Sequence, residues 1–192
     1  MRITKVELYD KYYSTYPQQA NLYKEDKEMP NHCYNRVTIY GSGNDTEETR
    51  EQIAKLKDIF EGESIFPQFI PEPDWPNTPL AESDVRKYSF SEPRGKVGEL
   101  PVKTEGAFGE SYRFASGEAD DRWYDWRLQN WDTKWDAYDV SIDDDDPDQL
   151  EVSFNTAWSP PEAICNEIRE QYPDVSVSWF YDEPGCEIAG YL

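Results

Sequence analysis

Hydrophobic and polar positions alternate along the first clearly patterned segment, MPNHCYNRVTIYGSGN. Cys33, Val37 and Ile39 share one parity, as expected for a strand with one buried face. The Gly-Ser-Gly that follows them is typical of a turn. The segment therefore predicts a strand that ends shortly before residue 41.

A helical period replaces the alternation in the next segment, TEETREQIAKLKDIF. Ile53, Leu56 and Phe60 lie on one stripe of a helix of about four turns. Asp45 precedes this segment and Glu48 lies three residues further on, which predicts an N-cap of the capping-box type at Asp45.

The C-terminal part repeats these two patterns. A hairpin is predicted from KWDAYDVSI and LEVSFNTAW, which alternate on either side of the turn DDDDPD. Ser159-Pro160 predicts the start of a second helix, whose apolar stripe consists of Ile164, Ile168 and Tyr172. DVSVSWFY and CEIAGYL then predict two further strands.

The order of these elements indicates an α+β fold. It predicts a ferredoxin-like βαββαβ unit with a mostly antiparallel sheet, two helices on one face, and a long insertion between the first helix and the second strand. We expect an N-terminal extension over residues 1–28 and a ferredoxin-like domain over 29–192. Within the domain, residues 74–118 form an irregular insertion that could hold a small hairpin.

Five motifs occur in a familiar order: MPNHCYNRVTIYG, FIPEP, WDTKWDAYDV, TAWSPP and a YP…Y-x-EPG ending. Together they resemble a family of phage and plasmid proteins with a YubB-type ferredoxin-like domain, over roughly residues 29–192. The family has a glycine where this chain has Asp132, and it commonly begins at the methionine that matches Met29. The resemblance implies a fold and a mobile-element setting, and no catalytic or ligand residues.

Tryptophans cluster in WYDWRLQNWDTKWDAYDV and raise two alternatives, a core plug and a stacking platform for a base or peptide. The indoles spread over about half a helical circumference, which favours burial on two sides. We therefore expect a structural core of Trp123, Trp126, Trp131, Trp135 and Trp158. Arg127 and Lys134 would be surface residues or cation–π partners of the rings.

Charge limits the partners of the protein. The chain is hydrophobic at only 37% of positions, but 15% aromatic residues indicate a folded domain. Its net charge of −21 should repel nucleic acid and anionic membranes, so we expect a basic protein partner. Fifteen acidic residues and one basic residue over 136–192 give that segment −14 of the total.

Little in the sequence suggests catalysis. The chain has one histidine, His32, and its cysteines Cys33, Cys165 and Cys186 are widely spaced, as expected for reduced thiols. We predict no catalytic residues, no metal site and no cofactor. The start of the chain lacks an apolar signal segment and no apolar run is long enough to span a bilayer, so we expect the protein in the host cell cytoplasm.

The acidic C-terminal region is the candidate binding surface. We expect a non-enzymatic phage-type interaction protein that binds and blocks a basic, nucleic-acid-binding host defence protein, with nucleic-acid mimicry as a candidate means. The expected contacts are Asp139, Asp143, Asp144, Asp145, Asp146, Asp148 and Glu151. Three alternatives stay open: an acidity that serves only solubility or salt adaptation, a structural or virion-associated assembly module, and a metal-dependent enzyme that uses the clustered carboxylates.

Overall fold

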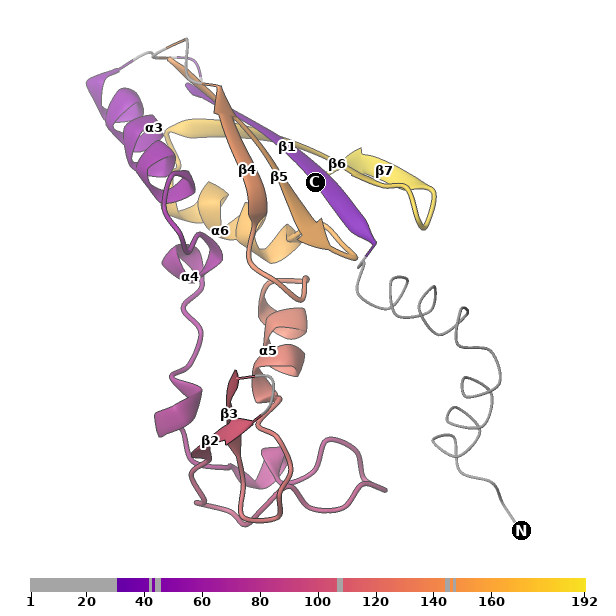
Figure 1. Ribbon diagram of the computed structural model, residues 1–192. Coiled ribbons are helices and arrows are strands. Elements are labelled where there is room, and N and C mark those ends of the chain that lie inside the picture. Colours follow the sequence, from indigo (N-terminus) through magenta and orange to yellow (C-terminus); the bar gives the residue numbers. More distant parts are fainter. Residues whose placement is uncertain (1–30, 42, 44–45, 107–108, 144–145, 147) are drawn as a thin grey trace.

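The computed structural model describes residues 31–41, 43, 46–106, 109–143, 146 and 148–192 (Figure 1). The predicted extension over 1–28 lies outside these residues, as do Asp45, Asp144 and Asp145. No helix among the described residues combines the length and the apolar character that a membrane span requires.

A five-stranded antiparallel sheet forms the upper half of the molecule, in the order β4-β5-β1-β6-β7 (Figure 1). Its strands are β1 (His32–Gly41), β4 (Tyr138–Asp143), β5 (Gln149–Ala157), β6 (Val175–Glu183) and β7 (Ile188–Tyr191). Without β7, this strand order is that of a ferredoxin-like βαββαβ unit, in which β1 lies between the strands that flank the second helix. The predicted α+β class and ferredoxin-like topology are confirmed.

Two helices cover one face of the sheet (Figure 1). Helix α3 (Glu47–Phe60) buries Ile53, Leu56 and Phe60, as its period predicts. Helix α6 (Glu162–Gln171) buries Ile164, Cys165 and Ile168. These side chains pack on the inward residues of the strands, which include Val37, Ile39, Val152, Phe154 and Trp179.

Both helices are capped differently from the sequence prediction. Thr46 is the N-cap of α3, and its hydroxyl accepts a hydrogen bond from the Thr49 amide. At the start of α6, Pro161 is the N-cap residue and no side chain of the cap position bonds to the helix. The carboxylate of Asp132 accepts a hydrogen bond from the Ala163 amide at 2.8 Å, so it stabilises this helix end from a distant part of the chain.

The segment between α3 and β4 forms the lower half of the molecule in Figure 1. It contains α4 (Phe66–Phe69), two short 3-10 turns (Trp75–Asn77 and Glu82–Asp84), the hairpin of β2 (Val102–Gly106) and β3 (Gly109–Arg113), and α5 (Arg122–Asn130). Arg122 is buried within it and bonds to Asp120 and to the carbonyl groups of Trp75, Thr78 and Pro79.

The motif WDTKWD joins the two halves. The Trp131 ring is completely buried against Phe66, and its Nε1 donates to the carbonyl of Ile70. Thr133, also completely buried, donates to the carbonyl of Ala157 in β5. Asp136 accepts hydrogen bonds from the Ile65 and Phe66 amides at the start of α4. Together with the contact between Asp132 and Ala163, the motif thus stabilises both ends of α4, the start of α6 and the end of β5.

Asp132 adopts a left-handed backbone conformation, with φ of 61°. This geometry is most easily adopted by glycine and is tolerated by aspartate, so Asp132 forms a turn here. The turn also ends α5 at Asn130, so Trp131 and Trp135 do not lie on one helix as an i, i+4 pair.

Candidate functional site

The face of the sheet that the helices leave uncovered carries a regular pattern of exposed side chains. Strand pairing places Tyr34, Arg36, Thr38 and Tyr40 of β1 on this face, opposite the buried residues Asn35, Val37 and Ile39. Their partners on β5 and β6 belong to the same face and are Gln149, Glu151, Ser153, Asn155, Ser176, Ser178, Phe180 and Asp182. We call this surface the open face.

Aromatic rings are concentrated on the open face. Tyr34 is 56% exposed, Tyr40 43% and Tyr191 70%. Phe180 is half-buried between its neighbours, since the Tyr191 ring packs edge-on against it at 5.3 Å and the Arg36 guanidinium lies 5.5 Å above it. Rings that expose a large rigid surface at low entropic cost are typical of protein interfaces.

Carboxylates flank these rings. Asp139 accepts a hydrogen bond from the Asn155 amide at 3.2 Å, and Glu151 accepts one from Gln149. Asp182 lies directly opposite Tyr34 in the β1–β6 pairing. No ion pair is present at these three carboxylates among the residues that the structure describes.

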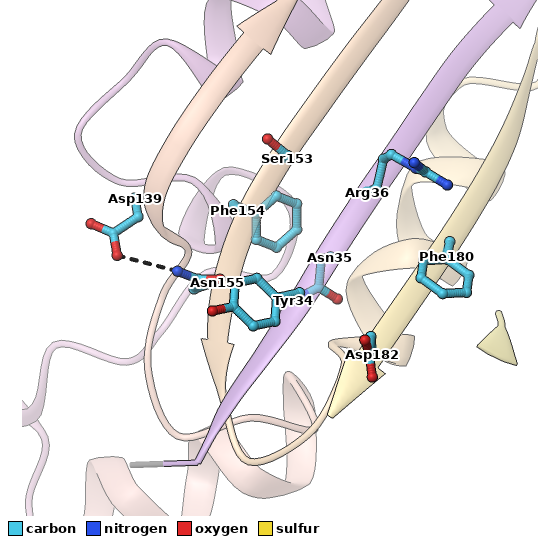
Figure 2. Close-up of a pocket in the computed structure, with 9 residues that line it drawn as sticks. All are labelled: Tyr34, Asn35, Arg36, Asp139, Ser153, Phe154, Asn155, Phe180 and Asp182. Atoms are coloured by element: carbon cyan, nitrogen blue, oxygen red, sulfur yellow. Dashed lines mark hydrogen bonds between the residues drawn. The ribbon is translucent and has the colours of Figure 1, made fainter. Parts of the chain in front are cut away.

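A shallow hollow of about 350 Å³ lies at the centre of this arrangement. Figure 2 shows Tyr34 between the strand that carries Asn155 and the strand that carries Asp182, with Arg36 and Phe180 one row further along. Arg36 has no carboxylate partner among the described residues. The hollow therefore offers an aromatic floor, two carboxylates and one guanidinium.

Tyr138 is the first residue of β4. Its hydroxyl lies 2.6 Å from His32 Nδ1 and donates to the Thr156 carbonyl at 3.4 Å. Burial, together with the neighbouring Asp139 carboxylate, raises the pKa of Tyr138 above its usual value. The contact fixes the start of β4, where Asp139 has φ of 52° and the β4–β5 register shifts.

The structure brings part of the predicted acidic surface together. Asp139, Asp143 and Glu151 share the open face, and Asp143 is paired directly with Glu151 across the β4–β5 ladder. Asp146 and Asp148 lie at the hairpin turn, where Asp148 forms an ion pair with Arg50 of α3 at 2.6 Å. Asp144 and Asp145 are outside the described residues. Exposed acids also occur on α3 and α6, so acidity is not confined to the open face.

The predicted tryptophan core needs correction. Trp131 is completely buried, and Trp126 packs against the core at a partly buried position. Trp158 is 56% exposed, so its assignment to the core is wrong: it follows the buried Ala157 in a left-handed turn at the end of β5 that directs its ring outward. Trp123 and Trp135 are half-buried and line a groove of about 550 Å³ with Trp75 and Tyr112.

Each of these half-buried indoles already contacts a cation of the chain. Arg127 lies 5.1 Å from the Trp123 ring and Lys134 lies 5.0 Å from the Trp135 ring. Arg127 also pairs with Glu72 at 2.6 Å. The two indoles that line the groove therefore already have cation–π partners within the chain.

The grouping of the acidic side chains and the burial of the thiols among the described residues are relevant to metal binding and thiol chemistry. Within the described ranges, no three His, Cys, Asp or Glu side chains are grouped so that they could hold a metal ion. The thiols of Cys33 and Cys165 are buried, and burial raises the pKa of each to about 11. Cys186 is exposed, and its hydrogen bond with Glu183 raises its pKa as well.

The fold defines a ferredoxin-like α+β protein with one sheet face that no described helix covers. A family model described as the ferredoxin-like domain in Api92-like protein matches residues 130–192, which contain β4 to β7 and α6. Among solved structures, the chain is similar to the crystal structure of a protein api92 from Yersinia pseudotuberculosis. That similarity has 11% identity and a TM-score of 0.41, and it covers 85% of this chain and 93% of the other. No curated protein matches the sequence.

Sequence reasoning missed the aromatic half of the open face. The signal was present in the alternation of HCYNRVTIY, because Tyr34, Arg36 and Tyr40 occupy the parity opposite to Cys33 and Val37. The contribution of Phe180 and Tyr191 from β6 and β7 depends on strand order, which a sequence pattern does not give.

Proposed function

We propose that the protein is a non-enzymatic interaction protein that binds a basic protein partner through the open face. The proposal depends on one observation: exposed tyrosines lie beside carboxylates on a sheet face that no described element covers. No cation among the described residues forms an ion pair with these carboxylates. Tyr34, Tyr40 and Tyr191 would supply contact area, and Asp139, Glu151 and Asp182 would supply charge complementarity.

Electrostatics supports a cationic partner. Asp143 and Glu151 are directly paired across the β4–β5 ladder on this face, which places two carboxylates side by side. Such a concentration of acidic groups would complement a basic surface. At a net charge of −21, long-range attraction would also raise the association rate with a basic protein, and this gain falls as salt increases.

The resemblance of the motifs to phage and plasmid proteins of the YubB type supports a mobile-element setting, in the cytoplasm of a bacterial host. There, a basic nucleic-acid-binding defence protein is the partner class that the charge favours. Carboxylates of the open face would compete with phosphates for its basic groove, so that the partner is blocked from nucleic acid. Arg36 would contact an acidic group of the same partner and fix the orientation.

The test is affinity capture from a lysate of the host with three baits. The first is the wild-type chain, and the second carries Asp139→Asn, Glu151→Gln and Asp182→Asn on the open face. The third is a matched control, Glu51→Gln, Asp58→Asn and Glu170→Gln, which removes three exposed carboxylates from α3 and α6. Capture is compared at about 0.05 M and about 0.5 M salt, because screening at the higher salt weakens surface electrostatics.

We expect a basic nucleic-acid-binding protein that the wild type and the control retain at low salt and that the open-face variant loses. The purified partner should then release a fluorescent nucleic acid when the wild-type chain is added. The proposal fails if no basic protein shows this pattern, or if the control variant loses the partner as completely as the open-face variant.

A further inference from the structure

A second pocket, separate from the open face, lies in the lower half of the molecule between α5 and the loop over residues 83–94. Its volume is about 490 Å³, within the range of small-molecule sites. Four basic side chains contribute to its lining: Arg86, Lys87, Arg94 and Arg122. In a chain with 19 basic and 40 acidic residues, this concentration of cations is unusual and independent of the proposed function.

Two of the four cations are built into the structure. Arg122 is 4% exposed, bonds twice to Asp120 at 2.8 Å, and lies between the rings of Trp75 and Phe114. Arg94 is 6% exposed and contacts Asp121 at 3.0 Å. Both guanidinium groups are therefore held in fixed positions, which lowers the entropic cost of binding an anion.

Among the described residues, Arg86 has no carboxylate within ion-pair distance, whereas Lys87 and Arg94 share two, Asp121 and Asp125. Asp121 is shared between Arg94 and Lys87, which lies 3.1 Å from it. Asp125 is more distant, at 3.8 Å from Arg94 and 3.9 Å from Lys87. Within the described part of the chain, Arg86 donates only to the Ser89 carbonyl. Arg86, Lys87 and Arg94 consequently present donors for a ligand anion.

Aromatic surface adjoins these donors. The Trp75 and Trp126 rings, which also line the pocket, meet edge-on at 6.5 Å. At the mouth, Tyr88 is 55% exposed and stacks on Phe90, which is 86% exposed, with ring centroids 5.5 Å apart and planes inclined by 8°. An exposed stacked pair provides a flat surface on which a planar ring can lie.

We propose that this pocket binds a nucleoside monophosphate, with the phosphate at Arg86, Lys87 and Arg94 and the base against Tyr88. Asp84 and Asp125 also line the pocket and would accept hydrogen bonds from ribose hydroxyls or base amino groups. These carboxylates favour a nucleoside portion over inorganic phosphate alone. A free nucleotide is favoured over a nucleic-acid strand, since a strand brings many more charges close to a protein of net charge −21.

Calorimetric titration of the full chain tests the site. The ligands are AMP, GMP, CMP, UMP, adenosine, inorganic phosphate and a ten-nucleotide single-stranded DNA. At least one monophosphate should bind about tenfold more tightly than both inorganic phosphate and adenosine. Arg86→Ala and Tyr88→Ala each remove an exposed side chain, and each should weaken that binding about tenfold.

Arg113→Ala is the control, because Arg113 is exposed on β3, does not line the pocket, and donates to the Gly117 carbonyl. Its binding should equal that of the wild type, and Arg86→Lys should restore part of the loss. The proposal is overturned if no monophosphate shows saturable binding, or if inorganic phosphate binds as tightly as the best monophosphate. It is also overturned if the DNA strand binds more tightly than every monophosphate, or if Arg113→Ala weakens binding as much as Arg86→Ala does.

Discussion

Removal of the Asp136 carboxylate should destabilise the protein far more than an exposed aspartate would. Its two oxygens accept hydrogen bonds from three backbone amides: Ile65 at 3.0 Å, Phe66 at 2.9 Å and Ala137 at 2.8 Å. Ile65 and Phe66 are 2% and 0% exposed, so in Asp136→Ala their amides lose their acceptor at a buried position. The contacts also hold the start of α4 against the segment that leads into β4.

The magnitude follows from the two buried amides. An unsatisfied buried donor costs about 1–3 kcal/mol, and because Asp136 is itself half-buried, water will replace part of the loss. We expect Asp136→Ala to lower the free energy of unfolding by about 2–4 kcal/mol. In a protein of this size, that change corresponds to a fall in Tm of about 4–16 °C. Asp136→Asn keeps one acceptor oxygen and should lose about half as much.

Urea unfolding monitored by tryptophan fluorescence measures the change, with the slope m expected to stay constant. Asp58→Ala is the matched control, since Asp58 is exposed on α3, and its effect should stay within about 0.5 kcal/mol. A loss below about 0.5 kcal/mol for Asp136→Ala, or equal losses for the two variants, would refute the assignment of Asp136 as a structural cap.

Four other predictions follow from single contacts. In urea unfolding, Asp132→Ala should cost about 2 kcal/mol and Asp132→Gly about 1 kcal/mol, because both lose the bond from the Ala163 amide but only glycine tolerates φ of 61° without strain. In the same assay, Trp131→Ala should lower the free energy of unfolding by about 4 kcal/mol, because the ring is completely buried, and Trp158→Ser by less than about 0.5 kcal/mol, because the ring is exposed. The opposite order would contradict the burial of the two rings. Glu151→Gln should stabilise the protein by about 0.5 kcal/mol at low salt, because it reduces the self-repulsion of a chain of net charge −21, and the gain should shrink as salt is added. A thiol reagent at pH 8 should modify Cys186 alone in the native protein and all three cysteines in urea. The folded-state pKa of about 11 for Cys33 and Cys165 exceeds the usual value of 9.0. The stability contributed by burying these two thiols in their protonated form is therefore complete below pH 9 and is lost between pH 9 and about 11.

The sequence was sufficient for the central layer of the fold. The apolar stripe of α3 and the alternation of β1 and β5 depend on local periodicity, so the sequence pattern alone assigns Ile53, Leu56, Val152 and Phe154 to the core that the fold contains. Local capping signals were less reliable. The start of α6 is stabilised by Asp132, 31 residues away in sequence, and no local motif at Ser159-Pro160 reveals such a contact.

The tryptophan-rich segment shows why the remaining structure escaped prediction. A helical wheel treats Trp131 and Trp135 as neighbours on one helix, but the left-handed Asp132 ends the helix between them. The burial of Trp131 then depends on contacts with Phe66 and Ile70 in and after α4, where the sequence carries no helical period that would reveal them. The nucleotide-sized pocket likewise combines residues from Trp75 to Gln129, and only tertiary folding brings Arg86 and Arg94 to the same side.

The placement of the carboxylates separates a binding role from general acidity. Selection for solubility requires only that acids reach water. Acids next to α3 pair with cations of that helix, as Glu61 does with Lys57 and Asp148 of the hairpin turn does with Arg50. On the open face, the described residues give Asp139 and Glu151 only amide donors, and these carboxylates stand beside tyrosines whose exposure solubility does not explain. If acidity alone mattered, the open-face and helix variants described above would respond identically to salt and partner. An interface instead requires that only the open-face substitutions abolish capture, because the tyrosines and the carboxylates must contact the same partner.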